Sequence, residues 1–247
     1  AISFAGVSCM QYISSSTGSY IDMSTLELVQ TQEPENGDPI ATIKTSLGDI
    51  KVVLYPEYAP NAVKNFTDLA ESGYYDNTYV FNSEPGVYFG AGSPNKNGDL
   101  NKDNEQAALE YEQELHQNLW PFKGALCSLT TSEEGGFWKK FKGESKILNG
   151  SRFAVLNSVE FTEDLKKELL ESDKNTTLAE AFIEYGGCPS LSQKITAFGQ
   201  TYEGFDVIDK LTSLEITDSE DGTKIPVEDI MIETIEIGTY SSKSDLK

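Results

Sequence analysis

The chain has 247 residues with 38% hydrophobic and 11% aromatic content, which is ample for a packed core in one large domain or two small ones. We expect one domain, because the motifs described below are spread along the whole length. The formal net charge of −21 argues against binding to nucleic acid or to anionic lipid, since their phosphates repel an acidic surface. An acidic surface serves solubility first; its functional alternatives are binding of cationic peptides or of Ca²⁺, and no EF-hand spacing supports Ca²⁺.

Residues that carry hydrolytic, nucleotide or metal chemistry are scarce. His116 is the only histidine, which excludes a two-histidine metal site, and neither G-x-S-x-G nor G-x-x-x-x-G-K occurs. The three cysteines, Cys9, Cys127 and Cys188, are odd in number and form no C-x-x-C pair, which argues against a disulfide framework or a zinc site. Cys127 lies in an apolar run and is expected in the core. We therefore expect neither a metal nor a cofactor.

Residues 1–39 are expected to form an N-terminal extension and a linker. The apolar run at 2–7 is too short to span a bilayer, which takes about 20 residues, so no membrane insertion is expected. The residues before Cys9 resemble a lipoprotein cleavage site. One interpretation is that this stretch is the end of an export segment of an extracytoplasmic bacterial protein. The alternative is a cytoplasmic protein in which it forms a strand or helix packed on the main domain. The polar stretch at 33–39 indicates a domain boundary.

Residues 40–92 change from the period of a strand to that of a helix and back. Gly48 stands between two alternating runs, as in a hairpin turn, and a Pro-Gly pair at 85–86 marks a second turn. The expected elements are strands at 41–45 and 49–55, a helix from Pro60 that ends at Gly73, and strands at 79–81 and 87–89.

The rest of the chain adds further strands and two insertions. The pattern predicts strands at 123–130, 194–199 and 227–237, a helix at 204–211 and a polar tail at 241–247. The first insertion, at about 132–148, interleaves aromatic residues with lysines and is either a packed hairpin with solvated lysines or an exposed contact surface. The second, at about 161–190, is predicted to form two helices, the later one from Thr177 with a capping box to Glu180.

Several of these motifs resemble one protein family. The run T-S-L-G-D-I-K-V-V-L-Y-P-E-Y-A-P-N-A-V-K-N-F at 45–66 is similar to the opening of the cyclophilins, which are peptidyl-prolyl cis-trans isomerases. N-G-S-R-F at 149–153 and F-G at 198–199 resemble later motifs of that family. The resemblance covers about 40–238, so we place the domain at 40–240. It implies a mainly β fold, a closed eight-stranded antiparallel barrel with two capping helices, to which this chain adds a helical insertion.

The resemblance also implies where the chemistry lies. Rotation about an X-Pro bond meets a barrier of about 18–20 kcal/mol that arises from amide resonance, so a catalyst needs only a donor to the prolyl nitrogen and an apolar pocket for the ring. In the family the donor is the arginine of F-H-R-x-x-P-G-F-x-x-Q-G-G. An ungapped match at Pro85-Gly86 places Asn82 at that arginine, and a neutral amide is the weaker donor.

The groove that the resemblance implies is altered as well. Arg152, the only arginine, stands at the family's groove-facing Gln, and Ala154 replaces an aromatic residue. We predict that Arg152 supplies the displaced cation; the alternative is a weak surface ion pair. The family's Trp is missing near Leu191. The predicted substrate contacts are Phe81, Val87, Tyr88, Gly90, Phe153, Ala154, Leu191 and Ile195, and the predicted catalytic residues are Asn82 and Arg152.

Two functions follow from this resemblance. The first is a weak cyclophilin-type prolyl isomerase that assists the folding of proteins by acting on their proline-containing segments. The alternative is a peptide-binding or scaffold module that keeps the barrel without turnover. An extracytoplasmic chaperone would overlap with both, and the sequence predicts no oligomeric state.

Overall fold

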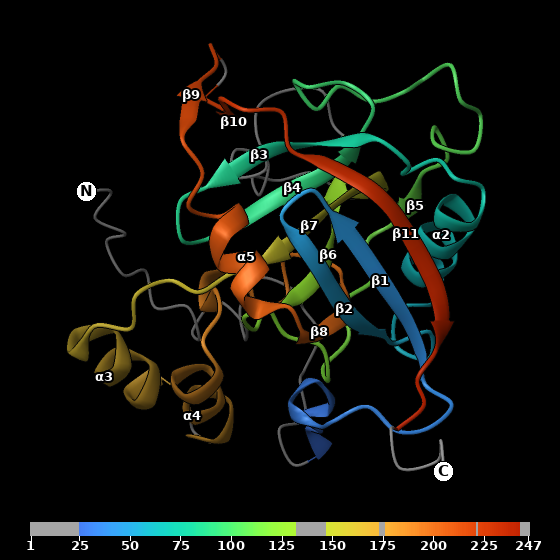
Figure 1. Cartoon of the computed structure of the whole chain (residues 1–247). Coiled ribbons are helices and arrows are strands. Elements are labelled where there is room, and N and C mark those ends of the chain that lie inside the picture. Colours follow the sequence, from blue (N-terminus) through green and yellow to red (C-terminus); the bar gives the residue numbers. More distant parts are fainter. Residues whose placement is uncertain (1–24, 132–146, 173–175, 221, 243–247) are drawn as a thin grey trace.

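Eight antiparallel strands close a barrel in the computed structural model, which describes residues 25–131, 147–172, 176–220 and 222–242 (Figure 1). The strands follow the order β4-β3-β11-β1-β2-β8-β6-β7, and pairing of β4 with β7 completes the ring. Their bounds are β1 Pro39–Thr45, β2 Gly48–Leu54, β3 Thr78–Glu84, β4 Tyr88–Ser93, β6 Ala125–Thr130, β7 Leu148–Leu156, β8 Ala197–Glu203 and β11 Met231–Thr239. The predicted closed eight-stranded barrel is confirmed.

Smaller elements surround the barrel. They are the helices α2 Pro60–Glu71, α3 Glu163–Ser172, α4 Thr176–Tyr185 and α5 Phe205–Leu211, the 3-10 turns η2 Val29–Thr31 and η3 Pro189–Leu191, and the short strands β5 Tyr111–Glu112, β9 Ile216–Asp218 and β10 Lys224–Pro226. Strand β5 extends the sheet beside β7, and β9 pairs with β10. Helices α2 and α5 pack on the barrel from different sides in Figure 1, as the two predicted capping helices.

The first hairpin and helix form where the sequence places them. Gly48 begins β2 with a φ of +133°, which favours glycine, and its carbonyl accepts a hydrogen bond from the Thr45 hydroxyl at 2.7 Å. Pro60 starts α2, and Gly73 follows its end with a φ of +74° while its N–H donates to the Ala70 carbonyl. The chain reversals on either side of α2 are therefore encoded locally.

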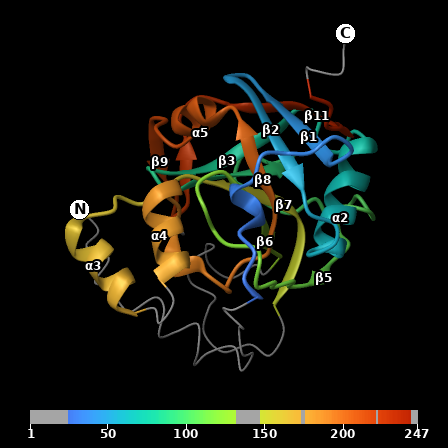
Figure 2. The same cartoon turned by 90° about the horizontal axis from the view of Figure 1, so that it is seen from below.

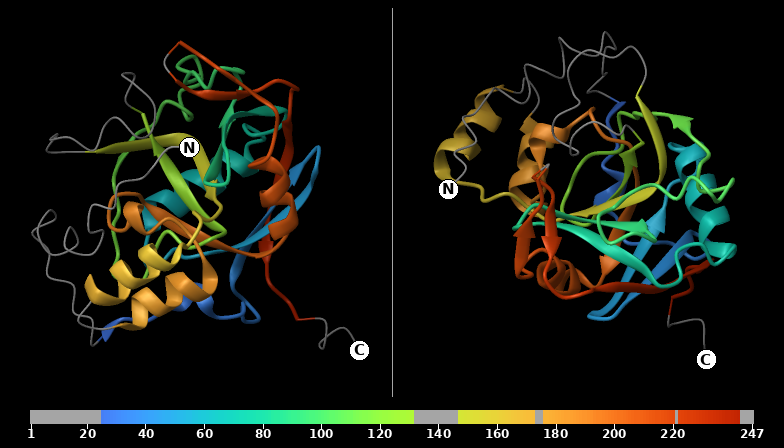
Figure 3. Two further views of the ribbon diagram at one scale, coloured as in Figure 1. Left: turned by 90° about the vertical axis from the view of Figure 1, so that its left-hand side faces the viewer. Right: turned by 90° about the horizontal axis from the view of Figure 1, so that it is seen from above.

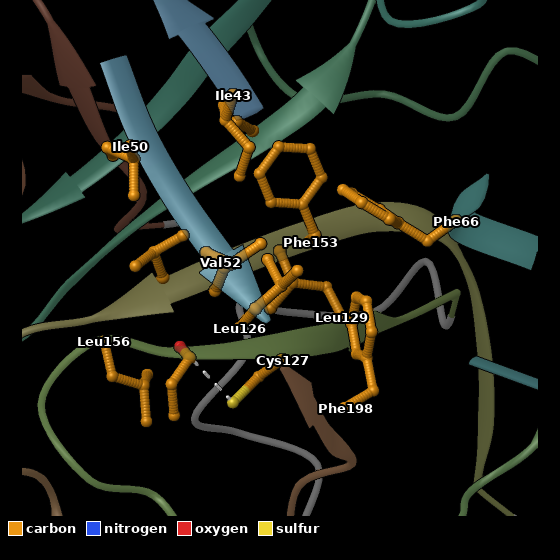
Figure 4. Packing of buried hydrophobic residues seen from close by; sticks show 14 of the residues in the cluster. Ile43, Ile50, Val52, Phe66, Leu126, Cys127, Leu129, Phe153, Leu156 and Phe198 are labelled. Carbon is orange, nitrogen blue, oxygen red and sulfur yellow. Dashed lines mark hydrogen bonds between the residues drawn. The ribbon is translucent and has the colours of Figure 1, made fainter. Parts of the chain in front are cut away.

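The core fills the barrel interior. Phe66 of α2 meets the ring of Phe153 edge-on, with centroids 5.6 Å apart, and lies 5.3 Å from the ring of Phe198 (Figure 4). Cys127 is fully buried, as predicted, and its thiol lies 3.9 Å from the Ala125 carbonyl. The contacts of Phe66 join α2 to two strands, β7 and β8.

The second insertion is a helical pair with a small core of its own. Helices α3 and α4 lie beside each other at one side of the barrel (Figures 1 and 3). The side chains they bury cluster with those of Trp120 and Phe122, and the rings of Phe122 and Phe182 are 4.7 Å apart. The predicted helix pair is confirmed, and it packs on the residues before β6.

The segment at 25–38 packs on the barrel as well (Figure 2). The buried Gln30 side chain accepts a hydrogen bond from the backbone N–H of Trp120 at 2.5 Å and donates one to the backbone carbonyl of Trp120 at 2.9 Å. Its Nε2 also donates to the Gln200 side chain at 3.0 Å. This part of the predicted extension is thus attached through buried hydrogen bonds, and the boundary after residue 39 stays a prediction. The export or packing role of residues 1–20 lies outside the described residues.

Two predicted strands begin later than expected, and two other predicted ranges lie outside the described residues. The last strand begins at Met231 instead of 227, because Lys224–Pro226 pairs with β9 and the chain bends after it. The strand predicted at 194–199 begins at Ala197, since Gln193 has a φ of +55° and a turn of chain follows η3. The aromatic and lysine-rich stretch of the first insertion, at 135–141, and the tail beyond 242 lie outside the described residues.

Candidate functional site

Three predicted site residues form a row across the outer face of the barrel. Asn82 of β3 pairs with Gly90 of β4, and Gly90 pairs with Ala154 of β7. Side chains alternate along a strand, and the ring of Phe153 points into the barrel against Phe66, so the neighbouring Ala154 points outward, where it is itself fully buried. The sequence match therefore placed these residues together, on strands that are far apart in the chain.

Asn82 is held in place by its neighbours. Its Nδ2 donates a hydrogen bond to the Tyr88 hydroxyl at 2.6 Å, and its Oδ1 accepts one from the backbone N–H of Lys224 at 3.3 Å. The side chain is only 9% exposed. A neutral N–H donor thus stands in the row, already bonded to a tyrosine that belongs to the same predicted set.

Phe81 lies against this row because β3 is irregular there. The pairing of β3 with β4 shifts between Val80 and Asn82, so Phe81 has no partner and is the bulged residue. A Cβ added to Gly90 would be 3.2 Å from the Phe81 ring, and one added to Gly98 would be 2.4 Å from it. The ring therefore occupies space that two glycines leave free. Gly98 was not predicted, although a glycine in a polar loop was the signal available.

Arg152 is bonded to the backbone of two segments. Its Nη1 donates to the Gly98 carbonyl and its Nη2 to the Thr130 carbonyl, each at 2.7 Å, and its Cζ lies 5.7 Å from the centre of the Phe81 ring. Burial lowers the pKa of Arg152, while the charge of Asp99 acts in the opposite direction. Nε is buried without a hydrogen-bond partner. Arg152 forms no ion pair with any residue that the structure describes, so the surface ion pair considered above is not what holds it.

The remaining predicted contacts lie deeper. The Phe153 ring points into the barrel against Phe66 and Tyr75, which differs from the groove-lining position predicted for it (Figure 4). Leu191 in η3 is fully buried and Ile195 nearly so, both within the main core cluster, and Val87 packs against that cluster. These residues thus belong to the core, which differs from the exposed substrate contacts predicted for them.

The described residues form neither a metal site nor a reactive thiol. No group of three or more His, Cys, Asp or Glu side chains converges as a metal site among the described residues. Burial raises the pKa of Cys188 to about 12 and that of Cys127 above its ordinary value, so neither thiol favours the reactive thiolate form. Among the same residues, no helix combines the length and apolar character needed to cross a membrane.

The closed barrel, its two capping helices and the row on its outer face define a protein of the cyclophilin type. The family model described as cyclophilin type peptidyl-prolyl cis-trans isomerase matches residues 40–237, and the chain belongs to that family. Two crystal structures of a Cryptosporidium parvum cyclophilin-type peptidyl-prolyl cis-trans isomerase are similar in fold. They have TM-scores of 0.53 and 0.52 and identities of 22% and 21%, and cover 83% and 82% of this chain and 99% of theirs. The second was determined in the presence of the dipeptide Ala-Pro.

Two bacterial relatives share more of the sequence. A Streptococcus pyogenes protein with the provisional name of a bifunctional phosphatase/peptidyl-prolyl cis-trans isomerase is 31% identical over 86% of this chain. The match spans only 41% of that longer protein. A Staphylococcus aureus protein with the provisional name of a peptidyl-prolyl cis-trans isomerase is 25% identical over 83% of this chain and 95% of its own length.

Proposed function

We propose that the chain is a peptidyl-prolyl cis-trans isomerase of low activity that acts on proline-containing segments of proteins and so assists their folding. The observation that carries the proposal is the row of Asn82, Gly90 and Ala154, at the positions where the family motifs place the donor and the groove. The names of the bacterial relatives support the same activity.

Isomerisation of an X-Pro bond requires no nucleophile and no metal from the protein. A catalyst lowers the barrier of about 18–20 kcal/mol by favouring the twisted amide, in which the prolyl nitrogen becomes pyramidal and accepts a hydrogen bond. In this proposal Asn82 supplies an N–H for this bond, and Ala154, at the pocket position of the family motif, borders the proline ring. A charge-assisted bond is roughly twice as strong as a neutral one, so turnover is slow. Arg152 keeps one unpartnered donor, Nε, through which it would contact a substrate oxygen.

NMR exchange spectroscopy on an Ala-Ala-Pro-Phe peptide tests the proposal. The protein should accelerate cis-trans exchange, and Asn82→Ala should lower kcat/KM about tenfold, the loss expected for one neutral hydrogen bond of about 1 kcal/mol or slightly more. Asn118→Ala removes an equally buried amide that bonds to the Glu27 N–H, away from the row, and should leave the rate unchanged. Exchange at the uncatalysed rate at every protein concentration would refute the enzymatic proposal.

The second candidate is a binding module without turnover. The burial of Asn82 and its hydrogen bond to Tyr88 favour it, because one of the two Nδ2 hydrogens is already engaged and the side chain offers the other with little exposure. Saturable binding of the same peptide without acceleration of exchange would identify such a module.

We also propose an extracytoplasmic location, which the residues before Cys9 support. Fractionation of cells that express the full-length natural protein, with an antibody against the barrel, tests it. Recovery in the cytoplasmic fraction alone would contradict it.

A further inference from the structure

We propose that Phe81 and Arg152 form a latch that closes the outer face of β3, β4 and β7, so that a proline segment binds only when the Phe81 ring moves away. The inference rests on the proposed function, because it concerns access to the same face. It assigns to these two side chains a gating role that is separate from the hydrogen bond of Asn82.

The bulge in β3 places the ring on the outer face. Phe81 is the extra residue between the pairs of Val80 with Ala91 and Asn82 with Gly90, and a bulge re-aims the side chain that it carries. The ring lies over Gly90, so close that a Cβ there would be 3.2 Å from it, inside the ordinary van der Waals distance. It thus covers the middle of the row on which the proline segment would lie.

The ring is enclosed from two further directions. Gly98, in the loop after β4, approaches it so closely that a Cβ at this position would be 2.4 Å from the ring. The Arg152 guanidinium lies 5.7 Å from the ring centre, and its two terminal nitrogens bond to the Gly98 and Thr130 carbonyls. The Arg152 guanidinium therefore contacts the loop after β4, the Phe81 ring and the end of β6. Phe81 is only 5% exposed.

The closed arrangement leaves one hydrogen-bonding group unsatisfied. Arg152 Nε is buried and has no partner, and a buried donor without an acceptor raises the free energy of the state that contains it. A peptide carbonyl that enters the face when the ring moves would satisfy this donor. Ligand binding and opening of the latch therefore favour each other, which is the condition for a shift between two populations.

Variants that open the latch should bind peptide more tightly than the wild type. A binding-competent state that makes up about one tenth of the molecules weakens the apparent affinity about tenfold, so Phe81→Ala should lower the Kd for an Ala-Ala-Pro-Phe peptide about tenfold. Arg152→Lys keeps the positive charge but loses the fork and the Nε donor, so the gain from the opened latch is partly offset by one lost bond to the peptide, and the Kd should fall by a smaller factor. If Nε contacts the substrate during turnover, this variant should bind more tightly and turn over more slowly.

The control is Leu178→Ala, which removes a fully buried side chain from α4, in the separate cluster around Trp120 and Phe122, and destabilises the fold away from this face. It should leave the Kd unchanged, which separates opening of the latch from general loosening. Isothermal titration of each full-length variant, after thermal unfolding has shown that it is folded, gives the Kd values. Tightening by Phe81→Ala and Arg152→Lys alone supports the latch.

Two results would overturn the latch, and they differ in what they say of the proposed function. If the wild type binds the peptide and both latch variants bind equally or more weakly, the latch is wrong and the proposed function stands. If neither the wild type nor any variant binds, the latch and the proposed function both fail.

Discussion

Replacing Gly98 by alanine probes the contact between the loop after β4 and the Phe81 ring. The new Cβ would lie 2.4 Å from Phe81 Cδ2, more than 1 Å inside the usual carbon contact of about 3.5–4.0 Å. Overpacking of this kind costs about 1–3 kcal/mol. The φ of +81° adds about 1–2 kcal/mol for a residue with a side chain. We therefore expect Gly98→Ala to lower the free energy of unfolding by about 3 kcal/mol, which lowers the Tm by about 6–12 °C in a domain of this size.

Two further variants separate these contributions in a calorimetric or urea unfolding experiment. Gly86→Ala, at a φ of +69° with no atom within 4 Å of the new Cβ, should show the backbone cost alone. In a Phe81→Ala background the clash is absent, so Gly98→Ala should then cost no more than Gly86→Ala does. A Gly98→Ala loss in the wild-type background that merely equals the Gly86→Ala loss would show that the ring does not lie where the structure places it.

Two more predictions concern parts of the fold away from this face. Gln30→Ala should lower the free energy of unfolding by about 2–4 kcal/mol, because it leaves the backbone N–H and carbonyl of buried Trp120 without their partner. Gln32→Ala, at an exposed position, should change the free energy of unfolding little. Equal effects of the two variants in urea unfolding would contradict this attachment of the N-terminal segment. Between pH 7 and 9 a thiol reagent should leave Cys127 and Cys188 unmodified in the folded protein, since burial raises the pKa of both thiols and keeps them protonated; rapid labelling of either, located by peptide mass, would refute their burial.

The barrel could be predicted because its turns are encoded locally. Gly48 and Pro60 mark the hairpin and the helix through properties of their own backbones, and the structure places the turn and the helix start there. The motif match then placed Asn82, Gly90 and Ala154 in one row, which the pairing of three strands reproduces.

The details of the face could not be predicted, because they depend on contacts between distant segments. A strict alternation of side chains along β3 would put Phe81 and Asn82 on opposite faces, but one bulged residue brings both to the outer face. The position of Arg152 depends on carbonyls 22 and 54 residues away in the chain. Gln30 likewise looked like part of a linker because its partners, Trp120 and Gln200, lie 90 and 170 residues further on.

The central claim is that a proline segment binds on the outer face of β3, β4 and β7. Titration of the ¹⁵N-labelled protein with an Ala-Ala-Pro-Phe peptide, followed by the backbone amide shifts, tests it directly. The account predicts saturable shifts centred on Asn82, Gly90 and Ala154, with Gly98 shifting as the latch opens. Saturable shifts confined to another surface, such as the segment at 29–35, would contradict it.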